Sequence, residues 1–329
     1  MPVRVAVVGA GLMGRLHAEI YQAEPGVDLV AIVEPDRSAH AELSARFRVP
    51  VHGDVGDVLD AVDALSVCTP DDIRRDILLP AFARGVRVLV EKPLATSLEE
   101  ADELIAACPS PDALMVGHLL RFDPRVAMAR AALERGDVGE VWAVRCWRNN
   151  STAVGDRIAP RTSVDWFLGI HDVDLVRHVT GLEITSVRAT ASSVRSHSRD
   201  LVRGELTFEN GRTAQVSWSW LLPPQRPSGL HAGIEVIGSD GMVEVDLSHN
   251  AVALTTAGLG RQTYLDTYHW PAQQGVPAGD LQAEIRAFLA TSPGSAPPVT
   301  AADGRKAVAV VSAIESSTIS GRTVDVARG

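Results

Sequence analysis

The stretch Arg4-Val5-Ala6-Val7-Val8, with Gly9-Ala10-Gly11-Leu12-Met13-Gly14 directly after it, decides how the first part of the chain folds. The apolar run predicts a strand, and the glycine-rich segment predicts a tight turn into a helix. In such a turn Gly9 permits the bend, Gly11 lets the backbone approach a pyrophosphate, and Gly14 lets helix and strand pack closely. The positive amino terminus of the helix attracts the phosphates. The pattern therefore predicts a dinucleotide site.

An acidic residue stands where such a site needs one. A second apolar run, residues 29–33, ends in Glu34, twenty residues after Gly14. A carboxylate in this place accepts hydrogen bonds from the adenosine ribose and repels a 2′-phosphate. The sequence therefore favours NAD over NADP, although Arg37 lies close enough to weaken that preference. The competing interpretation is a glycine turn with a solvated glutamate.

Strands and helices alternate through the first 120 residues, which predicts an α/β fold with a parallel sheet covered on both faces. Further strands are expected over 64–68, 87–90 and 114–117, and helices over 38–47, 54–62, 73–84 and 98–107. Parallel strands bring their carboxyl ends to one edge, where ligands bind. Thr69-Pro70 and Lys92 both follow strands, so we expect them in the same crevice as the glycine turn.

Lys92 is unusual for this chain. Of 31 residues that are Lys or Arg, two are lysines, Lys92 and Lys306. The stretch Val86 to Pro93 reads as a buried strand whose carboxyl end carries Glu91 and Lys92. An amine kept here suggests a task that arginine cannot perform, because a lysine can give up its proton near neutral pH. The alternative is a solvated lysine at the end of a strand.

Composition limits the remaining possibilities. The chain has 329 residues, enough for two domains, and a net charge of −10 without a basic tract, which argues against nucleic acid and anionic membranes. No apolar run approaches the length of a membrane span. Three scattered cysteines indicate neither disulfides nor a metal site. Met1 leads directly into a strand, so we expect a cytoplasmic protein with a small-molecule partner.

The chain resembles the glucose-fructose oxidoreductase and inositol dehydrogenase family (Gfo/Idh/MocA). The resemblance rests on seven stretches in this order: Gly9 to Gly14 with His17; Cys68-Thr69-Pro70; Glu91-Lys92-Pro93-Leu94; Gly117 to Pro124; Gly136 to Val141; Gly169-Ile170-His171-Asp172-Val173-Asp174; and Ser320 to Val324.

The resemblance implies a Rossmann dinucleotide-binding domain over residues 1–120 and an α+β domain with a large, open, mostly antiparallel sheet over 121–329. The terminal helices are expected to pack back on the first domain. The resemblance also implies that Lys92 and His171 face the substrate and the nicotinamide, and that the Lys92-Pro93 bond is cis. The expected cofactor contacts are Gly9, Gly11, Leu12, Met13, Gly14, Glu34, Arg37, Cys68, Thr69, Pro70, Glu91, Lys92 and Arg121.

Two positions depart from the family pattern. Arg74 stands where members commonly carry a histidine, and Phe167 stands where many carry an aspartate four residues before the catalytic histidine. Asp165 is a poor replacement, because six residues at about 100° each leave it roughly 120° round the helix from His171. The expected Lys-Asp-His arrangement is therefore incomplete, or its acid comes from another segment.

The second domain starts at Arg121 and contains alternating segments typical of an antiparallel sheet. Residues 150–163 read either as a substrate-facing loop or as a plain connection, and 164–180 as a helix that carries His171 and His178. Trp218 and Trp220 share a face and suit sugar stacking, sheet packing or a subunit interface. The candidate substrate contacts are Arg121, Asn149, Arg157, Arg161, Trp166 and Asp174.

An open sheet face must be covered, so we predict a homo-oligomer, a dimer or tetramer, formed through the sheet of the second domain. The main functional hypothesis is hydride transfer between NAD and a secondary alcohol of a sugar, an inositol or a sugar nucleotide. His171 would act as general acid/base, because an imidazole with a pKa of about 6.5 suits proton transfer at neutral pH, and Lys92 would stabilise the reacting oxygen. The alternatives are an NAD(P)H-dependent imine or keto-sugar reductase and a non-catalytic dinucleotide sensor.

Overall fold

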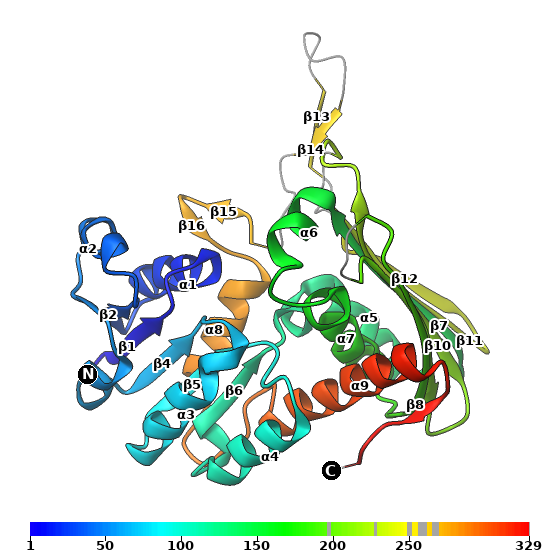
Figure 1. Cartoon of the computed structure of the whole chain (residues 1–329), viewed down its shortest axis with the longest axis horizontal. Coiled ribbons are helices and arrows are strands. Elements are labelled where there is room, and N and C mark those ends of the chain that lie inside the picture. The colour runs from blue at the N-terminus through cyan, green and yellow to red at the C-terminus, as the bar shows by residue number, and fades with distance from the viewer. Residues whose placement is uncertain (196–198, 227–228, 249–251, 256–261, 265–269, 329) are drawn as a thin grey trace. The chain divides into compact units, whose positions relative to one another are not determined.

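The computed structural model describes residues 1–195, 199–226, 229–248, 252–255, 262–264 and 270–328 (Figure 1). These residues fall into two compact units. The first contains residues 1–119 and 272–308, and the second contains residues 120–271 and 309–329, apart from the positions outside the described ranges. The first unit is therefore discontinuous in sequence and includes a segment from the C-terminal part of the chain.

The first unit is built on a six-stranded parallel sheet with the strand order β3-β2-β1-β4-β5-β6. Its strands are β1 (Val3–Val8), β2 (Val27–Val33), β3 (Val51–His52), β4 (Ala64–Val67), β5 (Arg87–Glu91) and β6 (Leu114–Gly117). Most side chains of the inner strands are buried because helices cover both faces of the sheet. The order reverses between β1 and β4, which places a crevice at the carboxyl ends of these two strands.

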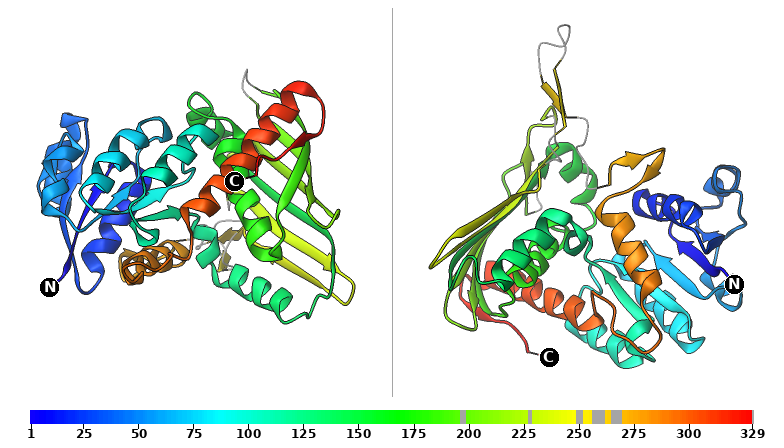
Figure 2. Two further views of the ribbon diagram at one scale, coloured as in Figure 1. Left: turned by 90° about the horizontal axis from the view of Figure 1, so that it is seen from below. Right: turned by 180° about the vertical axis from the view of Figure 1, so that it is seen from behind.

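Helices on the two faces of this sheet form two groups (Figure 2). Helix α1 packs beside α2 and α8 on one face, and α3 packs beside α4 on the other. Their bounds are α1 (Leu12–Ala23), α2 (His40–Phe47), α3 (Arg74–Ala83), α4 (Leu98–Ala107) and α8 (Asp280–Ala290), and a short hairpin of β15 (Ala272–Gln273) and β16 (Val276–Pro277) precedes α8. The amino end of α9 (Ala301–Ser320) also belongs to this unit, and the helix continues into the second unit.

The second unit contains a seven-stranded sheet with the order β12-β11-β7-β10-β9-β8-β17. Its strands are β7 (Val141–Ser151), β8 (Ile184–Ser192), β9 (Leu201–Phe208), β10 (Thr213–Leu222), β11 (Leu230–Gly238), β12 (Met242–Asp246) and β17 (Val324–Asp325). The pair of β7 and β10 is parallel, and the other pairs are antiparallel. The prediction of a mostly antiparallel second sheet is therefore confirmed. A separate pair of short strands, β13 (Ala253–Thr255) and β14 (Gln262–Tyr264), lies outside this sheet.

Helices of the second unit lie on one face of the large sheet (Figure 1). They are α5 (Pro124–Glu134), α6 (Thr152–Ile158), α7 (Ile170–Thr180) and the carboxyl part of α9. The two tryptophans of β10 explain this packing, because Trp218 is 0% and Trp220 is 1% exposed. A Cβ at Gly169 would meet the ring of Trp218 at 2.9 Å, and one at Gly155 would stand 2.6 Å from Trp220 Cβ. Both tryptophans therefore belong to the core, and the packing interpretation is confirmed over sugar stacking.

Three sequence-based expectations about local structure need correction. Residues 54–62 form two 3-10 turns, Val55–Asp57 and Leu59–Ala61, instead of a helix. Asp54 accepts a hydrogen bond from the Gly56 N–H at 2.7 Å, which favours a tight turn over a helical nucleus. Residues 150–163 are not an irregular loop, because α6 forms there to pack on β10. The expected helix over 164–180 begins with a π-helical turn, Asp165–Gly169, before α7.

Across the described ranges, no helix combines the length and the apolar character that crossing a bilayer requires.

Candidate functional site

The glycine turn has the geometry that its sequence predicts. Gly9 adopts a φ of +89°, a region that disfavours side chains, and its N–H donates to the Val33 carbonyl at 2.8 Å. A Cβ at Gly14 would stand 1.8 Å from the Gly9 carbonyl oxygen, so only glycine lets α1 approach β1 this closely. A Cβ at Gly11 would meet no atom within 4 Å, so the space at the start of the helix is open.

Glu34 follows β2 and turns its carboxylate toward the glycine turn. Its Oε2 accepts a hydrogen bond from the Ala10 N–H at 2.9 Å, and its Oε1 accepts one from the Asp36 N–H at 3.0 Å. These bonds fix a negative charge beside the turn, where a 2′-phosphate would be repelled. Arg37 lies on the exposed 3-10 turn Arg37–Ala39 that follows.

The carboxyl ends of β4 and β5 lie at the same edge of the parallel sheet as the glycine turn. A Cβ at Gly9 would lie 3.0 Å from the carbonyl of Cys68 and 3.1 Å from Thr69 Cγ2, so the residues after β4 border the glycine turn. Glu91 ends β5 and is buried, and the half-buried Lys92 follows it. The Lys92-Pro93 bond is cis, as the resemblance implies.

These residues fit a dinucleotide. The amino terminus of α1 has no side-chain cap and no acidic residue in its first turn, so its N–H groups are available to a phosphate. Leu12 is exposed and Met13 is half-buried at this end. Together with the open space at Gly11 and the carboxylate of Glu34, this donor set suits a pyrophosphate and a ribose. Among the residues with described positions, no group of three or more His, Cys, Asp or Glu could hold a metal ion.

A chain of buried polar side chains runs beneath the sheet edge from α1 to Glu91. His17 Nδ1 lies 2.7 Å from Ser66 Oγ, and the Tyr21 hydroxyl lies 3.2 Å from the same oxygen. His17 Nε2 lies 3.5 Å from Glu91 Oε1. Burial opposes the charge of Glu91, but the neighbouring His17 and the charges of Lys92 and Arg74 lower its pKa below the usual value. The Glu91 carboxylate is therefore held as an anion next to Lys92.

Glu284 on α8 is a second buried acid in this unit. It is 0% exposed, and neither carboxyl oxygen has a hydrogen-bond partner within the described ranges. Burial raises its pKa well above the usual value, and the negative charges of Glu91 and Asp280 raise it further. Two buried carboxylates cannot both ionise cheaply, so Glu91 carries the charge and Glu284 stays protonated.

Helix α7 carries His171 directly before two buried aspartates, Asp172 and Asp174. Asp172 is fully buried, with its Oδ1 2.8 Å from Arg148 Nη2 and its Oδ2 accepting a hydrogen bond from Trp218 Nε1 at 2.9 Å. Burial raises the pKa of Asp172, whereas the charge and hydrogen bond of Arg148 lower it. These contacts attach the helix to β7 and β10. They therefore hold in place the backbone that carries the half-buried His171.

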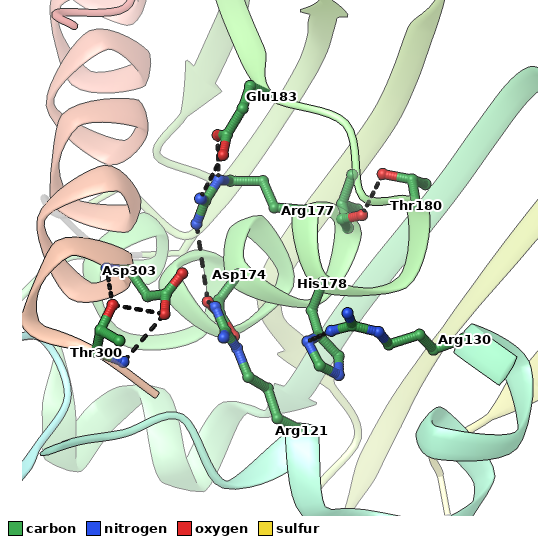
Figure 3. A network of polar contacts seen from close by, with 10 residues as sticks. Arg121, Arg130, Asp174, Arg177, His178, Thr180, Glu183, Thr300 and Asp303 are labelled. Carbon is green, nitrogen blue, oxygen red and sulfur yellow. Dashed lines mark hydrogen bonds and ion pairs between the residues drawn. The ribbon is translucent and has the colours of Figure 1, made fainter. Parts of the chain in front are cut away.

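Arg121 and Asp174, two residues expected at the ligand, pair with each other. Arg121 Nε donates to Asp174 Oδ2 at 2.8 Å, and Asp174 is 1% exposed. Arg177 lies 3.9 Å from Asp174 Oδ1 and donates to Glu183 at 2.9 Å, which extends the network across α7 (Figure 3). Asp174 therefore orients Arg121, and a direct contact of either residue with a ligand stays a prediction.

Phe167, in the place of the expected aspartate, packs against Trp220 with a ring-centroid distance of 6.3 Å. Asp165 does not take over that position. It is 0% exposed, and its Oδ2 lies 3.7 Å from Arg199 Nη1. Burial raises the pKa of Asp165, and Arg199 partly offsets this effect. The position therefore carries a half-buried aromatic ring that packs on Trp220.

The other candidate substrate residues of the second unit lie in different places. Trp166 is 8% exposed, and its Nε1 donates to Glu315 at 3.3 Å. Arg157 on α6 and Arg161 after it are exposed. Asn149 alternates with Arg148 along β7 and lies on the sheet face opposite α7. The structure thus places Asn149 apart from His171.

Sequence reasoning missed Ser66, Tyr21 and Glu284 as members of the buried polar chain and its neighbourhood. Polar residues within an apolar strand or on the buried stripe of a helix were the available signal. Their partners come from segments far apart in the sequence, so the signal did not identify the pairing.

A glycine turn, a carboxylate after the second strand and an uncapped helix end at the switch point of a parallel sheet define a Rossmann-type dinucleotide-binding protein. The family description "Oxidoreductase family, NAD-binding Rossmann fold" matches residues 3–118, and that of the GFO/IDH/MocA C-terminal domain matches residues 126–244. The chain belongs to the Gfo/Idh/MocA family of oxidoreductases, as the sequence resemblance predicted, and its cofactor is NAD by that family description.

Known relatives support the same family. An inositol 2-dehydrogenase of Rhizobium meliloti is 30% identical over 256 residues, which cover 75% of this chain and 76% of the relative. A UDP-N-acetylglucosamine 3-dehydrogenase of Acidithiobacillus ferrooxidans is 28% identical over 290 residues, covering 87% and 88%. The crystal structure of GenD2 from gentamicin A biosynthesis, in complex with NAD, is 27% identical, with a TM-score of 0.83 and coverage of 99% and 97%.

Replacing Glu284 by Gln should make the stability of the folded protein depend less on pH. Folded Glu284 keeps its proton above the usual carboxyl pKa, and the unfolded chain does not. The free energy of unfolding therefore falls as pH rises from about 4.5 through the raised pKa. In thermal unfolding between pH 5 and pH 8, the gain in Tm of Glu284→Gln over wild type should grow with pH. Glu99→Gln, at an exposed site on α4, serves as the control. A Tm difference that stays constant across this range would contradict the assignment.

Proposed function

We propose that this protein is an NAD-dependent dehydrogenase that acts on a secondary alcohol of a sugar, an inositol or a sugar nucleotide. One observation carries the proposal: the glycine turn, Glu34 and Lys92 follow strands of one parallel sheet and meet at its carboxyl edge. The names of the relatives, an inositol 2-dehydrogenase and a UDP-N-acetylglucosamine 3-dehydrogenase, support this substrate class.

The residues of the first unit would hold the cofactor. Backbone N–H groups at the start of α1, from Leu12 and Met13, would bind the pyrophosphate, and Glu34 would accept hydrogen bonds from the ribose. NAD supplies the hydride acceptor when it is bound. The preference for NAD over NADP rests on the fixed negative charge of Glu34 beside the turn.

Two side chains would handle the reacting oxygen and its proton. The Lys92 amine would hydrogen-bond the substrate oxygen and stabilise negative charge that develops on it. The His171 imidazole would take the hydroxyl proton during oxidation and return it during reduction. Asp172 holds the helix that carries His171, through its contacts with Arg148 and Trp218.

A second candidate function is reduction of an imine or a keto-sugar. Phe167 favours it, because this position carries an aromatic ring packed on Trp220 instead of the acid that many family members have there. Reduction of a pre-polarised C=N bond needs less help from a neighbouring carboxylate. A location in the cytoplasm stays a prediction from the sequence.

We also propose that a second copy of the chain covers the open face of the large sheet. This face is hollowed, with a volume of about 520 Å³ lined by residues that include Arg145, Arg188, Arg203, Glu205 and Gln215. Glu205 pairs in register with Arg188 on one side and Gln215 on the other. A face that carries both charge signs suits a symmetric contact with itself.

Light scattering at micromolar concentration should therefore give two or four times the mass of one chain. Arg203→Glu should shift the population toward the monomer, because it places a second negative charge beside Glu205. Arg135→Glu, an exposed site whose partner is Asp137, should leave the mass unchanged. A wild-type monomer would contradict the proposed interface.

Turnover tests the proposed function directly. With NAD and a panel of cyclic polyols, sugars and sugar nucleotides, the wild type should form NADH, seen by its absorbance. Lys92→Ala and His171→Ala should each lower kcat by about 10²–10³-fold, because each loses a group that acts on the transition state. NADH binding, measured by nicotinamide fluorescence, should change little in both variants. NADH-dependent turnover on imines or keto-sugars alone would favour the second candidate, and binding without turnover would favour a sensor.

A further inference from the structure

Arg74 is a buried arginine at the first residue of α3. Arg74 is only 4% exposed, although its side chain carries a guanidinium group. The helix follows the 3-10 turn Asp71–Ile73, which in turn follows Thr69-Pro70 at the end of β4. A buried guanidinium needs hydrogen-bond acceptors for its five N–H donors. The identity of those acceptors indicates what the side chain holds in place.

Every hydrogen bond that Arg74 makes within the described ranges goes to a main-chain carbonyl. Its Nη2 donates to the Thr69 carbonyl at 2.9 Å, and its Nε donates to the same oxygen at 3.3 Å. Its Nη1 donates to the carbonyls of Glu91 and Pro93, and its Nη2 also reaches the Lys92 carbonyl at 3.4 Å. One side chain therefore connects the end of β4 with three consecutive carbonyls at the end of β5 and directly after it.

Those three carbonyls belong to the turn that carries Lys92. The ladder between β5 and β6 ends at the pair of Glu91 and Gly117, so backbone pairing stops at Glu91. Pro93 has no N–H and contributes no donor to the turn. The guanidinium supplies donors that this backbone lacks, and its planar fork sets the directions in which they point.

We propose that Arg74 is a positioning residue for Lys92. It fixes the main chain of Glu91, Lys92 and Pro93 against the end of β4. It thereby sets the backbone position from which the Lys92 side chain extends. The inference rests on the proposed function in giving Lys92 a role in the reaction. Arg74 itself does not touch the substrate or the reacting atoms in this proposal.

The first test does not depend on catalysis. Because the chain has two lysines, protein labelled with ¹³C in its lysine side chains gives two ε-methylene signals in NMR, and Lys306→Arg assigns them. Arg74→Gln should change the chemical shift and the titration of the Lys92 signal and leave that of Lys306 in place. Arg75→Gln is the matched control, because Arg75 is the next residue on α3 and pairs at the surface with Glu103. An unchanged Lys92 signal in Arg74→Gln would overturn the proposal.

The second test separates positioning from a merely structural role. Turnover is divided by the number of NADH sites found by fluorescence titration, so misfolded protein is not counted. Arg74→Gln should lower kcat per site by about 10-fold or more with KM changed less than about 3-fold. In a Lys92→Ala background, the same substitution should cost less than about 2-fold, because its effect passes through Lys92. A full loss of about 10-fold in both backgrounds, or a normal kcat per site, would contradict the proposal.

Two failures remain distinguishable. If the wild type turns over no substrate, or if Lys92→Ala keeps full turnover, the proposed function fails and the NMR result still decides the role of Arg74. If Arg74→Gln does not fold, Arg74→Lys replaces it, because lysine keeps the charge and loses the fork. This variant adds a third lysine signal, which the comparison with the wild-type spectrum identifies. The Lys92 signal and the kcat per site should change in the same direction as in Arg74→Gln by a smaller factor, and wild-type values would overturn the proposal.

Discussion

The close approach of α1 to β1 is the constraint on which the first unit depends. With a Cβ at Gly14 only 1.8 Å from the Gly9 carbonyl oxygen, no larger residue lets the helix start where it does. This approach points the helix amino terminus at the switch point of the sheet and leaves its N–H groups without a side-chain cap. The carboxylate of Glu34 then completes a site with donors at one end and an acceptor at the other.

Burial and nearby charges determine the pKa shifts of the acidic side chains that lie beneath the carboxyl edge of the parallel sheet. The nearby His17, Lys92 and Arg74 lower the pKa of Glu91 against the effect of its burial, whereas burial raises the pKa of Glu284 and the negative charge of Glu91 raises it further. Arg74 holds the backbone of the same turn through carbonyl oxygens. In the second unit, the buried Asp172 forms an ion pair with the buried Arg148. Both candidate reacting groups, Lys92 and His171, thus start from backbone that is fixed by buried polar contacts.

Much of the fold could be predicted from the sequence, because the glycine turn, the alternating strands and helices and the period-two segments are local signals. The positions of Glu34 and Lys92 at the carboxyl ends of strands were predictable for the same reason, and their contact with a ligand stays a prediction. Local signals failed where distant partners decide the outcome. Helix α6 forms within residues 150–163 because Trp220 offers a packing surface, and Asp174 pairs with Arg121 across 53 residues of sequence. The acceptors of Arg74 likewise come from another strand end.

Hydride transfer is tested most directly by following the hydrogen. The protein is incubated with NAD and with cyclic polyols, sugars and sugar nucleotides that carry deuterium on their carbinol carbons, and the NADH formed is examined by mass spectrometry. We expect NADH that carries deuterium at C4 of the nicotinamide, because the carbinol hydrogen moves directly to the cofactor. Cofactor that is bound but never labelled, or NADH that forms without the label, would contradict a dehydrogenase that acts on secondary alcohols.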